Sequence, residues 1–297
     1  MKWFTACNQS SLEQQQFFDL LKVAILSANR NTALSPYILY DGNDCEGLKW
    51  LVDHGVTVLH RSLSFYSPLR DFILENFDEE LLRVRSGAFL RTELPVALKE
   101  FDITDRFVVY TDVDVVFADK LQLDRWRPEY LAACGRRCGG FTRFRIGGEY
   151  HFNSGVMVMN VDALRGEYDR FVDFVINNAP GIDRPAHPLM QKHLFMSDQA
   201  ALNLYYRGRI DRLPNDYNWS AFRGFNPKAR IVHFHGLKWT QWEDFLAQRL
   251  RKDRQEKFTR YIRRHRNDFA RYVNWAAGFL EDDLESDEAP DSIQACS

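Results

Sequence analysis

Short apolar runs alternate with amphipathic segments along most of the chain. Apolar and β-branched residues predict β-strands at residues 3–7, 37–40, 56–59, 107–111, 155–160 and 231–235. Apolar positions spaced three or four residues apart predict helices at residues 11–29, 46–53, 86–99, 161–178 and from 197 onward. This alternation of strands and helices indicates βαβ units, so the pattern predicts an α/β protein built on one mixed, mainly parallel sheet.

Two carboxylates, Asp112 and Asp114, directly follow the strand predicted at residues 107–111. The apolar character of that strand predicts an interior position in the sheet, and ligands bind at the carboxyl ends of such strands. Two like charges there repel one another unless a cation lies between them, and hard divalent cations prefer oxygen ligands. The pattern therefore predicts a metal site, although Asp residues also mark ordinary turns after strands.

An apolar strand followed by Asp-x-Asp also resembles the first motif of haloacid-dehalogenase-type phosphatases, in which the first Asp is a nucleophile. In that class the motif lies near the start of a domain, with a Lys and an acidic pair downstream. Here a segment with its own βαβ pattern precedes Asp112, and the acidic residues 281–283 follow no predicted strand. A nicotinamide dehydrogenase is disfavoured because no Gly-x-Gly-x-x-Gly follows the first strand.

Composition and charge narrow the class of protein. The chain has 297 residues, of which 45% are hydrophobic and 27% charged, as in ordinary globular proteins. Its net charge of −2 gives no support for nucleic-acid binding. No apolar stretch approaches the roughly 18 residues of a membrane-spanning helix. The sequence becomes polar within residues 1–8, too early for the apolar core of a signal peptide, which predicts a protein without one. Five scattered cysteines are typical of a reducing compartment, which predicts the cytoplasm.

The segment from Leu246 to Tyr272 is rich in basic and aromatic residues. Ten Lys and Arg residues alternate there with aromatic and aliphatic side chains, which predicts one helix. Two interpretations remain open: peripheral contact with an anionic membrane, or a helix packed on the domain by its aromatic stripe. Residues 281–297 are acidic and featureless, which predicts a disordered tail.

Several further segments, in this order, resemble glycosyltransferase family 8, the group that contains glycogenin and the bacterial lipopolysaccharide galactosyl- and glucosyltransferases. The segments are Ala6-Cys-Asn8, Phe89-Leu-Arg-Thr-Glu-Leu-Pro95, Tyr110-Thr-Asp-Val-Asp114, Phe152-Asn-Ser-Gly-Val-Met-Val-Met-Asn160, Asp198-Gln199, Leu213-Pro-Asn-Asp-Tyr-Asn-Trp219 and Val232-His-Phe-His-Gly236. The resemblance implies a GT-A fold over residues 1–240, followed by a helical extension at 241–280 and the acidic tail at 281–297. It also implies retaining transfer of a hexose-type sugar from a UDP-sugar to a glycan, lipid-linked or protein acceptor.

The resemblance implies a metal bound by Asp112, Asp114 and His233, and His235 is the competing imidazole because it points to the same side of its strand. Two carboxylates with an imidazole suit Mn²⁺ better than Mg²⁺, which stays an alternative. The catalytic candidates are Asp198, as a covalent nucleophile, or Gln199, steadying a front-face reaction. The donor-binding candidates are Ala6, Asn8, Arg91, Asp112, Asn153, Ser154, Gly236 and Lys238.

One segment departs from the family pattern. The family follows its His-Phe-x-Gly strand with two residues and Lys-Pro-Trp, whereas this chain has Gly236-Leu-Lys-Trp239, one residue shorter and without the proline. The departure keeps open a second function class, a catalytically inactive nucleotide-sugar-binding partner subunit.

Overall fold

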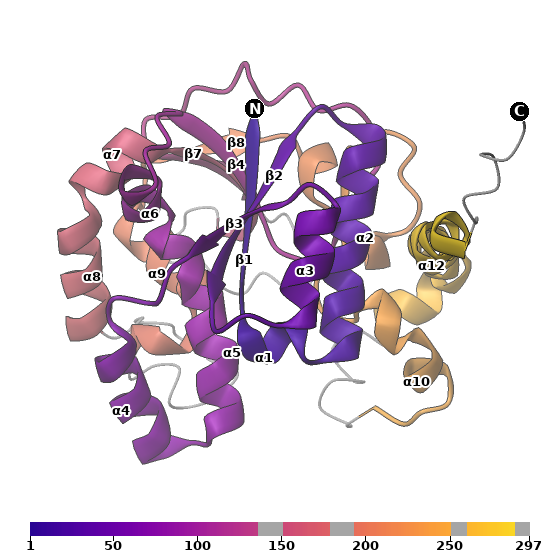
Figure 1. Cartoon of the computed structure of the whole chain (residues 1–297), viewed down its shortest axis with the longest axis horizontal. Helices are drawn as coiled ribbons and strands as arrows, with labels where there is room; N and C mark the ends of the chain where they lie inside the picture. Colours follow the sequence, from indigo (N-terminus) through magenta and orange to yellow (C-terminus); the bar gives the residue numbers. More distant parts are fainter. Residues whose placement is uncertain (136–150, 179–192, 251–259, 289–297) are drawn as a thin grey trace, which may run out of the picture.

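A seven-stranded sheet runs through the molecule in the order β3-β2-β1-β4-β7-β6-β8 (Figure 1). The computed structural model describes residues 1–135, 151–178, 193–250 and 260–288. The strands are β1 Lys2–Asn8, β2 Ser35–Asp41, β3 Thr57–His60, β4 Phe107–Thr111, β6 Leu131–Gly135, β7 Phe152–Asn160 and β8 Ile210–Leu213. Only β7 runs antiparallel to its neighbours, β4 and β6. The predicted mixed, mainly parallel sheet is confirmed, and the strand before Asp112 lies in its interior as expected.

A second sheet was not expected. It has three strands in the order β5-β10-β9, with β5 Val115–Phe117, β9 Trp219–Ser220 and β10 Ile231–His233. The prediction that residues 231–235 form a strand of the main sheet is therefore wrong. In the main sheet, β4 pairs with β7. The chain bends after Thr111, so β5 does not continue beside β7 and instead pairs antiparallel with β10. Asp112 and Asp114 consequently lie at the junction of the two sheets.

The helices cover both faces of the main sheet. Alternate residues of β1 enter different apolar clusters, with Phe4 and Ala6 in one and Trp3 and Cys7 in the other. Such alternation is expected of an interior strand buried on both faces. The helices of this part of the chain are α1 Gln9–Leu12, α2 Gln15–Asn31, α3 Glu46–Asp53, α4 Tyr66–Asn76, α5 Glu79–Phe89, α6 Leu94–Glu100, α7 Val161–Gly166, α8 Tyr168–Asn177 and α9 Asp198–Tyr205.

Three predicted helices are each divided, and the one expected at residues 11–29 is interrupted between Leu12, the end of α1, and Gln15, the start of α2. The helix expected at residues 86–99 is α5 and α6 joined by a 3-10 turn, Leu90–Glu93. Pro95 lies in the first turn of α6, where its missing N–H is tolerated, but it cannot donate back into α5. The helix expected at residues 161–178 ends at Gly166 and begins again at Tyr168. The turn between α5 and α6 carries Arg91, which was predicted to bind the donor.

The C-terminal extension differs from its prediction in two respects. The prediction of a single helix from Leu246 to Tyr272 is wrong. Helix α10, Trp242–Leu246, ends at Leu246, and Gln248 has a positive φ of 57°, which a right-handed helix does not contain. Residues 251–259 lie outside the described residues. The disorder predicted from residue 281 is wrong as far as residue 288, because α12 Arg266–Glu288 continues that far beside α2 (Figure 1). The carboxylate of Asp282 pairs with Arg30 at 2.8 Å, which helps hold this end.

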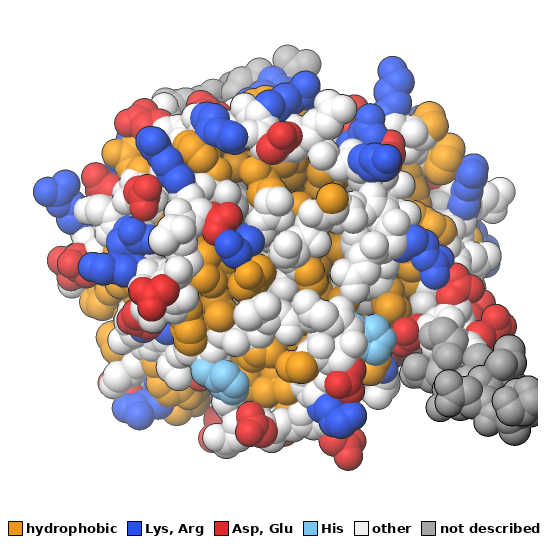
Figure 2. Space-filling view, turned by 45° about the horizontal axis from the view of Figure 1, so that its top comes forward, with side chains coloured by type: hydrophobic (Ala, Val, Ile, Leu, Met, Phe, Trp, Pro, Cys, Tyr) orange, Lys and Arg blue, Asp and Glu red, His pale blue; other side chains and the backbone are white. Residues whose placement is uncertain are grey.

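The apolar side chains of the extension pack inward. Ile262, Phe269 and Tyr272 are buried in a third cluster that includes Val23 of α2 and Val116 of β5. For the described residues, this burial favours the packed-helix interpretation over insertion of the aromatic stripe into a membrane. No helix in the described part of the chain has the length and apolar character that crossing a bilayer requires. On the face shown in Figure 2, acidic and basic side chains are interspersed.

Candidate active site

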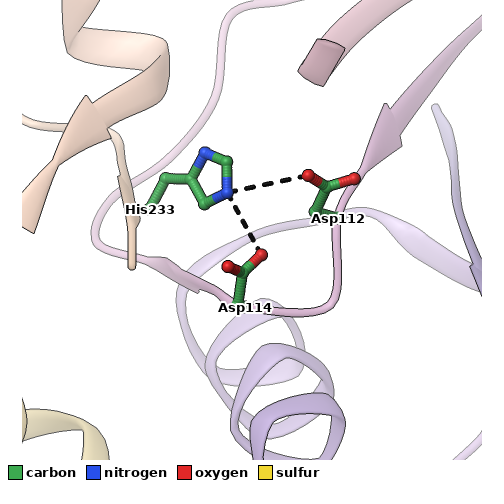
Figure 3. Close-up of side chains that lie close together, drawn as sticks. All are labelled: Asp112, Asp114 and His233. Atoms are coloured by element: carbon green, nitrogen blue, oxygen red, sulfur yellow. Dashed lines mark hydrogen bonds and ion pairs between the residues drawn. The ribbon is translucent and has the colours of Figure 1, made fainter. Parts of the chain in front are cut away.

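Asp112, Asp114 and His233 point toward one another at the junction of the two sheets (Figure 3). Asp112 follows β4, Asp114 precedes β5 and His233 ends β10. The Nε2 atom of His233 lies 3.1 Å from Oδ1 of Asp114 and 3.7 Å from Oδ2 of Asp112. The three potential ligand atoms lie within 4.8 Å of one another, a spacing that one bound cation could bridge. These three residues are called the triad below.

Two cations neutralise the carboxylates of the triad. Lys238 forms an ion pair with Asp114, and Nη2 of Arg91 lies 2.8 Å from Oδ1 of Asp112. Burial opposes ionisation of Asp114, but Lys238 and His233 outweigh burial and hold the pKa of this carboxyl well below its usual range. Burial lowers the pKa of Arg91, but Asp112 and Asp198 together raise it above its usual value. Asp114 is therefore ionised, and ready to bind a cation, throughout the neutral range.

The donor set fits a divalent metal. Two carboxylates and an imidazole are ligands that Mn²⁺ accepts. The other ring nitrogen of His233, Nδ1, lies 2.9 Å from Oδ1 of Asn218, and a partner of this kind orients a metal-binding imidazole. A Cβ built on Gly155 would lie 2.2 Å from Cε1 of His233 and 2.8 Å from Oδ2 of Asp112. The glycine therefore leaves the space that the triad needs.

A pocket of about 280 Å³ opens beside the triad. Its lining includes apolar side chains, among them Phe17 and Leu20 of α2. Arg91, Lys238 and the triad residues also line it. The remaining lining residues are Ala6, Cys7, Ser10, Ser11, Gln14, Glu80, Arg83, Val84, Gly87, Ala88, Tyr110, Val113 and His235.

Asn8, a predicted donor-binding residue, does not line this pocket. Its Oδ1 accepts a hydrogen bond from the Ser11 backbone N–H at 3.2 Å and so caps α1. Its Nδ2 donates to the Arg83 carbonyl at 2.7 Å. Both ends of the amide are therefore engaged within the protein, joining α1 to α5 behind the pocket wall.

The remaining candidates meet where β7 begins and α9 begins. Nδ2 of Asn153 donates to Oε1 of Gln199 at 2.9 Å, and the Ser154 hydroxyl donates to Asp198 at 3.4 Å. Nε of Arg91 lies 3.2 Å from Oδ2 of Asp198, so one guanidinium joins this cluster to Asp112. Ser197 caps α9, with its hydroxyl accepting from the Ala200 N–H.

Gly236 and Lys238 lie in a turn after β10, and of the two only Lys238 lines the pocket. Gly236 has a φ of 99°, a conformation that glycine adopts without strain. Lys238 then contacts Asp114 although this segment is one residue shorter than the family pattern. His235 also lines the pocket, but His233 is the imidazole that completes the triad.

The sequence-based hypothesis missed two residues that shape the triad. Gly155 was part of a quoted motif and of a predicted strand, but no role at the triad was predicted for it, although a Cβ there would meet both His233 and Asp112. Asn218 was part of a quoted motif, but nothing in its spacing predicted contact with His233. The polar lining residues Ser10, Ser11, Gln14 and Arg83 were also missed, because helix periodicity alone does not show which side chains face a pocket.

No protein-family model and no curated protein sequence matches the chain. Solved structures do match it, and they show that the chain has the GT-A glycosyltransferase fold, as predicted. The galactosyltransferase LgtC, in complex with donor and acceptor sugar analogues, is 17% identical with a TM-score of 0.58, covering 88% of this chain and 95% of that one. The glycosyltransferase GlyE of Streptococcus pneumoniae is 17% identical with a TM-score of 0.51, covering 78% and 54%. Mouse xyloside xylosyltransferase 1 is 13% identical with a TM-score of 0.50, covering 78% and 97%.

Proposed function

We propose that this protein is a metal-dependent glycosyltransferase that moves a hexose-type sugar from a UDP-sugar to a glycan, lipid-linked or protein acceptor. The observation that carries the proposal is the triad of Asp112, Asp114 and His233 beside a pocket, within a glycosyltransferase fold. A divalent metal bound there, Mn²⁺ or Mg²⁺, would supply Lewis-acid stabilisation of the leaving diphosphate. Lys238 would add a fixed positive charge close to the same phosphates.

The contacts of Asp198 bear on how configuration would be retained. Its Oδ2 is engaged by Nε of Arg91 and by the Ser154 hydroxyl. A carboxylate oxygen that accepts from a cation is a weaker nucleophile, so these contacts favour a front-face reaction over a covalent intermediate. Gln199 would then steady the positive charge that develops on the sugar, while the leaving phosphate takes the proton of the acceptor hydroxyl.

Two other classes fit the geometry less well. A haloacid-dehalogenase-type phosphatase would need a nucleophilic Asp112, but Arg91 pairs with this carboxylate at 2.8 Å. An inactive partner subunit was suggested by the shortened segment after Gly236. Lys238 nevertheless reaches Asp114, so the shortening does not remove the cation from the site.

The exposed basic residues of the C-terminal extension support peripheral contact with an anionic membrane, held by charge rather than by insertion. Each such residue near an anionic surface contributes on the order of 1 kcal/mol. Replacing Arg260, Arg263 and Arg264 together by Glu should abolish co-sedimentation with phosphatidylserine vesicles, whereas unchanged co-sedimentation would remove this role. The exposed basic residues in the described part of the extension are Arg249, Arg260, Arg263, Arg264, Arg266 and Arg271.

Metal-dependent donor hydrolysis tests the main proposal. A panel of UDP- and GDP-sugars should be incubated with the protein in Mn²⁺, in Mg²⁺ and in chelator. Release of UDP from one UDP-hexose, present in either metal and absent in chelator, is the expected result. No release from any donor would favour the inactive partner subunit.

A further inference from the structure

Four polar side chains form a hydrogen-bonded chain between α9 and the triad. Oε1 of Gln199 accepts from Nδ2 of Asn153 at 2.9 Å, and Oδ1 of Asn153 accepts from Nδ2 of Asn218 at 2.7 Å. Oδ1 of Asn218 in turn faces Nδ1 of His233 at 2.9 Å. Asn153, Asn218 and His233 are buried, so water does not readily replace a missing partner.

Two backbone N–H groups fix the direction of this chain. The Ser154 N–H donates to Oε1 of Gln199 at 3.2 Å, and the Gly155 N–H donates to Oδ1 of Asn153 at 3.1 Å. A backbone N–H can only donate, so both of these side-chain atoms must be amide oxygens. The Asn153 amide is thereby held with its nitrogen toward Gln199 and its oxygen toward Asn218.

The fixed direction determines the protonation of the histidine ring. Asn218 must present its nitrogen to the oxygen of Asn153, which leaves its own oxygen for His233. An amide oxygen accepts only, so Nδ1 of His233 carries a proton. Nε2, which forms a hydrogen bond of 3.1 Å with Oδ1 of Asp114, is then the nitrogen whose lone pair a bound metal would take.

We propose that Asn218 is a positioning residue that holds His233 in the Nδ1–H tautomer and so presents Nε2 to the metal. The metal rests on the proposed function, but the tautomer does not. The same chain of amides connects the metal ligand to Gln199 at the start of α9. In neutral imidazole only one nitrogen carries a lone pair for a metal, so loss of the Asn218 oxygen removes the preference for the binding-competent form.

Nitrogen-15 spectra of the histidine rings in the metal-free protein test the tautomer. The chain has 8 histidines, and the His233 signals can be identified by their absence in His233→Ala. The wild-type ring should carry a proton on Nδ1. Asn218→Leu, which removes both polar atoms, should lose this preference, whereas Asn218→Asp keeps an acceptor and should retain it. A wild-type ring with bare Nδ1 and protonated Nε2, or an unchanged ring in Asn218→Leu, would overturn the proposal.

Calorimetric titration with Mn²⁺ supplies the second readout. Loss of a group that orients a metal ligand typically weakens affinity about 10- to 100-fold, and this loss is expected for Asn218→Leu but not for Asn218→Asp. Asn160→Leu is the matched control, because Asn160 is a buried amide at the far end of β7 that bonds the carbonyls of Pro128 and Glu129. Equal Mn²⁺ affinity in Asn218→Leu and wild type would overturn the inference. A wild-type ring with the expected tautomer that binds no Mn²⁺ would support the inference and contradict the proposed function.

Discussion

At the residue scale, Asp114 is the residue whose negative charge we expect to affect turnover most. Asp114→Asn keeps the shape of the side chain but removes the charge that faces His233 and Lys238. Loss of one electrostatic stabiliser of this kind costs about 3–4 kcal/mol, or roughly a hundred- to a thousand-fold in turnover. Turnover should therefore fall by that factor in saturating Mn²⁺, with the midpoint of thermal unfolding as a control for folding. Full activity of Asp114→Asn in chelator would contradict the metal mechanism.

His233, the last residue of β10, is the predicted ligand, and His235, two residues later, is its competitor. His233→Ala should weaken Mn²⁺ affinity, because His233 lies within 3.7 Å of both carboxylates. His235→Ala should change that affinity much less, because His235 lines the pocket outside the triad. Titration of turnover against Mn²⁺ measures both. A fully active His233→Ala with an inactive His235→Ala would show that the ligand is the other imidazole.

Substitution of Gly155 tests the geometry of the triad. The Cβ of Gly155→Ala would lie 2.2 Å from the ring of His233, and the Asn218 contact prevents that ring from moving freely. We expect Mn²⁺ affinity to fall at least about 10-fold, as for loss of other groups that orient a ligand. Gly166→Ala is the matched control, since a Cβ there meets nothing within 4 Å. Equal calorimetric affinities for the two variants would argue against the described geometry.

The candidate site shows which residue roles a sequence can predict. Asp112, Asp114 and His233 were predicted from a motif pattern, and the structure brings them together. Asn218 was not predicted, because its role depends on a turn and a strand that meet only in the folded chain. Asn8 was placed near the nucleotide, yet its amide caps α1. Polar residues serve as caps and as ligands equally well, and the sequence does not distinguish the two uses.

At the scale of elements, helix α12 should contribute to stability through its apolar face. Phe279 is buried in the third cluster, and Phe→Ala changes in a core cost about 3–5 kcal/mol. Phe279→Ala should lower the free energy of unfolding by that amount in denaturant titrations. Leu284→Ala on the same helix should change it by less than about 0.5 kcal/mol, because Leu284 is 64% exposed. Equal small effects would mean that α12 does not pack as described.

Element boundaries were predicted where local signals are strong. β4 at residues 107–111 and α3 at residues 46–53 agree with the structure. The acidic residues at 281–288 were predicted as disordered from composition alone. They continue helix α12, in which Phe279 and Asp282 both contact Arg30 of α2. Tertiary packing of this kind overrides composition and is not readable from local sequence.

At the scale of the whole molecule, the alternation of strands and helices predicted the fold class. It did not predict the second sheet, because pairing of β5 with β10 joins segments far apart in sequence and depends on the bend after Thr111. Strands of two or three residues, such as β9 and β5, carry too few residues for a periodic signal. The pocket depends on this long-range arrangement, since its walls come from α2, α5 and the segment after β10.

Nucleotide choice is a property of the whole pocket. The resemblance to glycosyltransferase family 8 implies a UDP-sugar donor, and the pocket of about 280 Å³ beside the triad would hold its nucleotide. UDP should therefore bind more tightly than GDP in Mn²⁺, and more tightly than CMP because the second phosphate adds charge near Lys238 and Arg91. Competitive calorimetry measures the three affinities under one set of conditions. GDP or CMP binding at least as tightly as UDP would contradict the proposed donor.

Asp112, Asp114 and His233 are proposed to hold a metal against the diphosphate of a bound nucleotide. A crystal of the protein with UDP and Mn²⁺, measured at a wavelength where manganese scatters anomalously, would locate that metal. We expect one strong anomalous peak at metal–ligand distance, about 2.0–2.2 Å, from one oxygen of each carboxylate and from Nε2 of His233, with UDP in the adjoining pocket. UDP bound with no manganese peak, or a peak bonded to His235 instead, would contradict it.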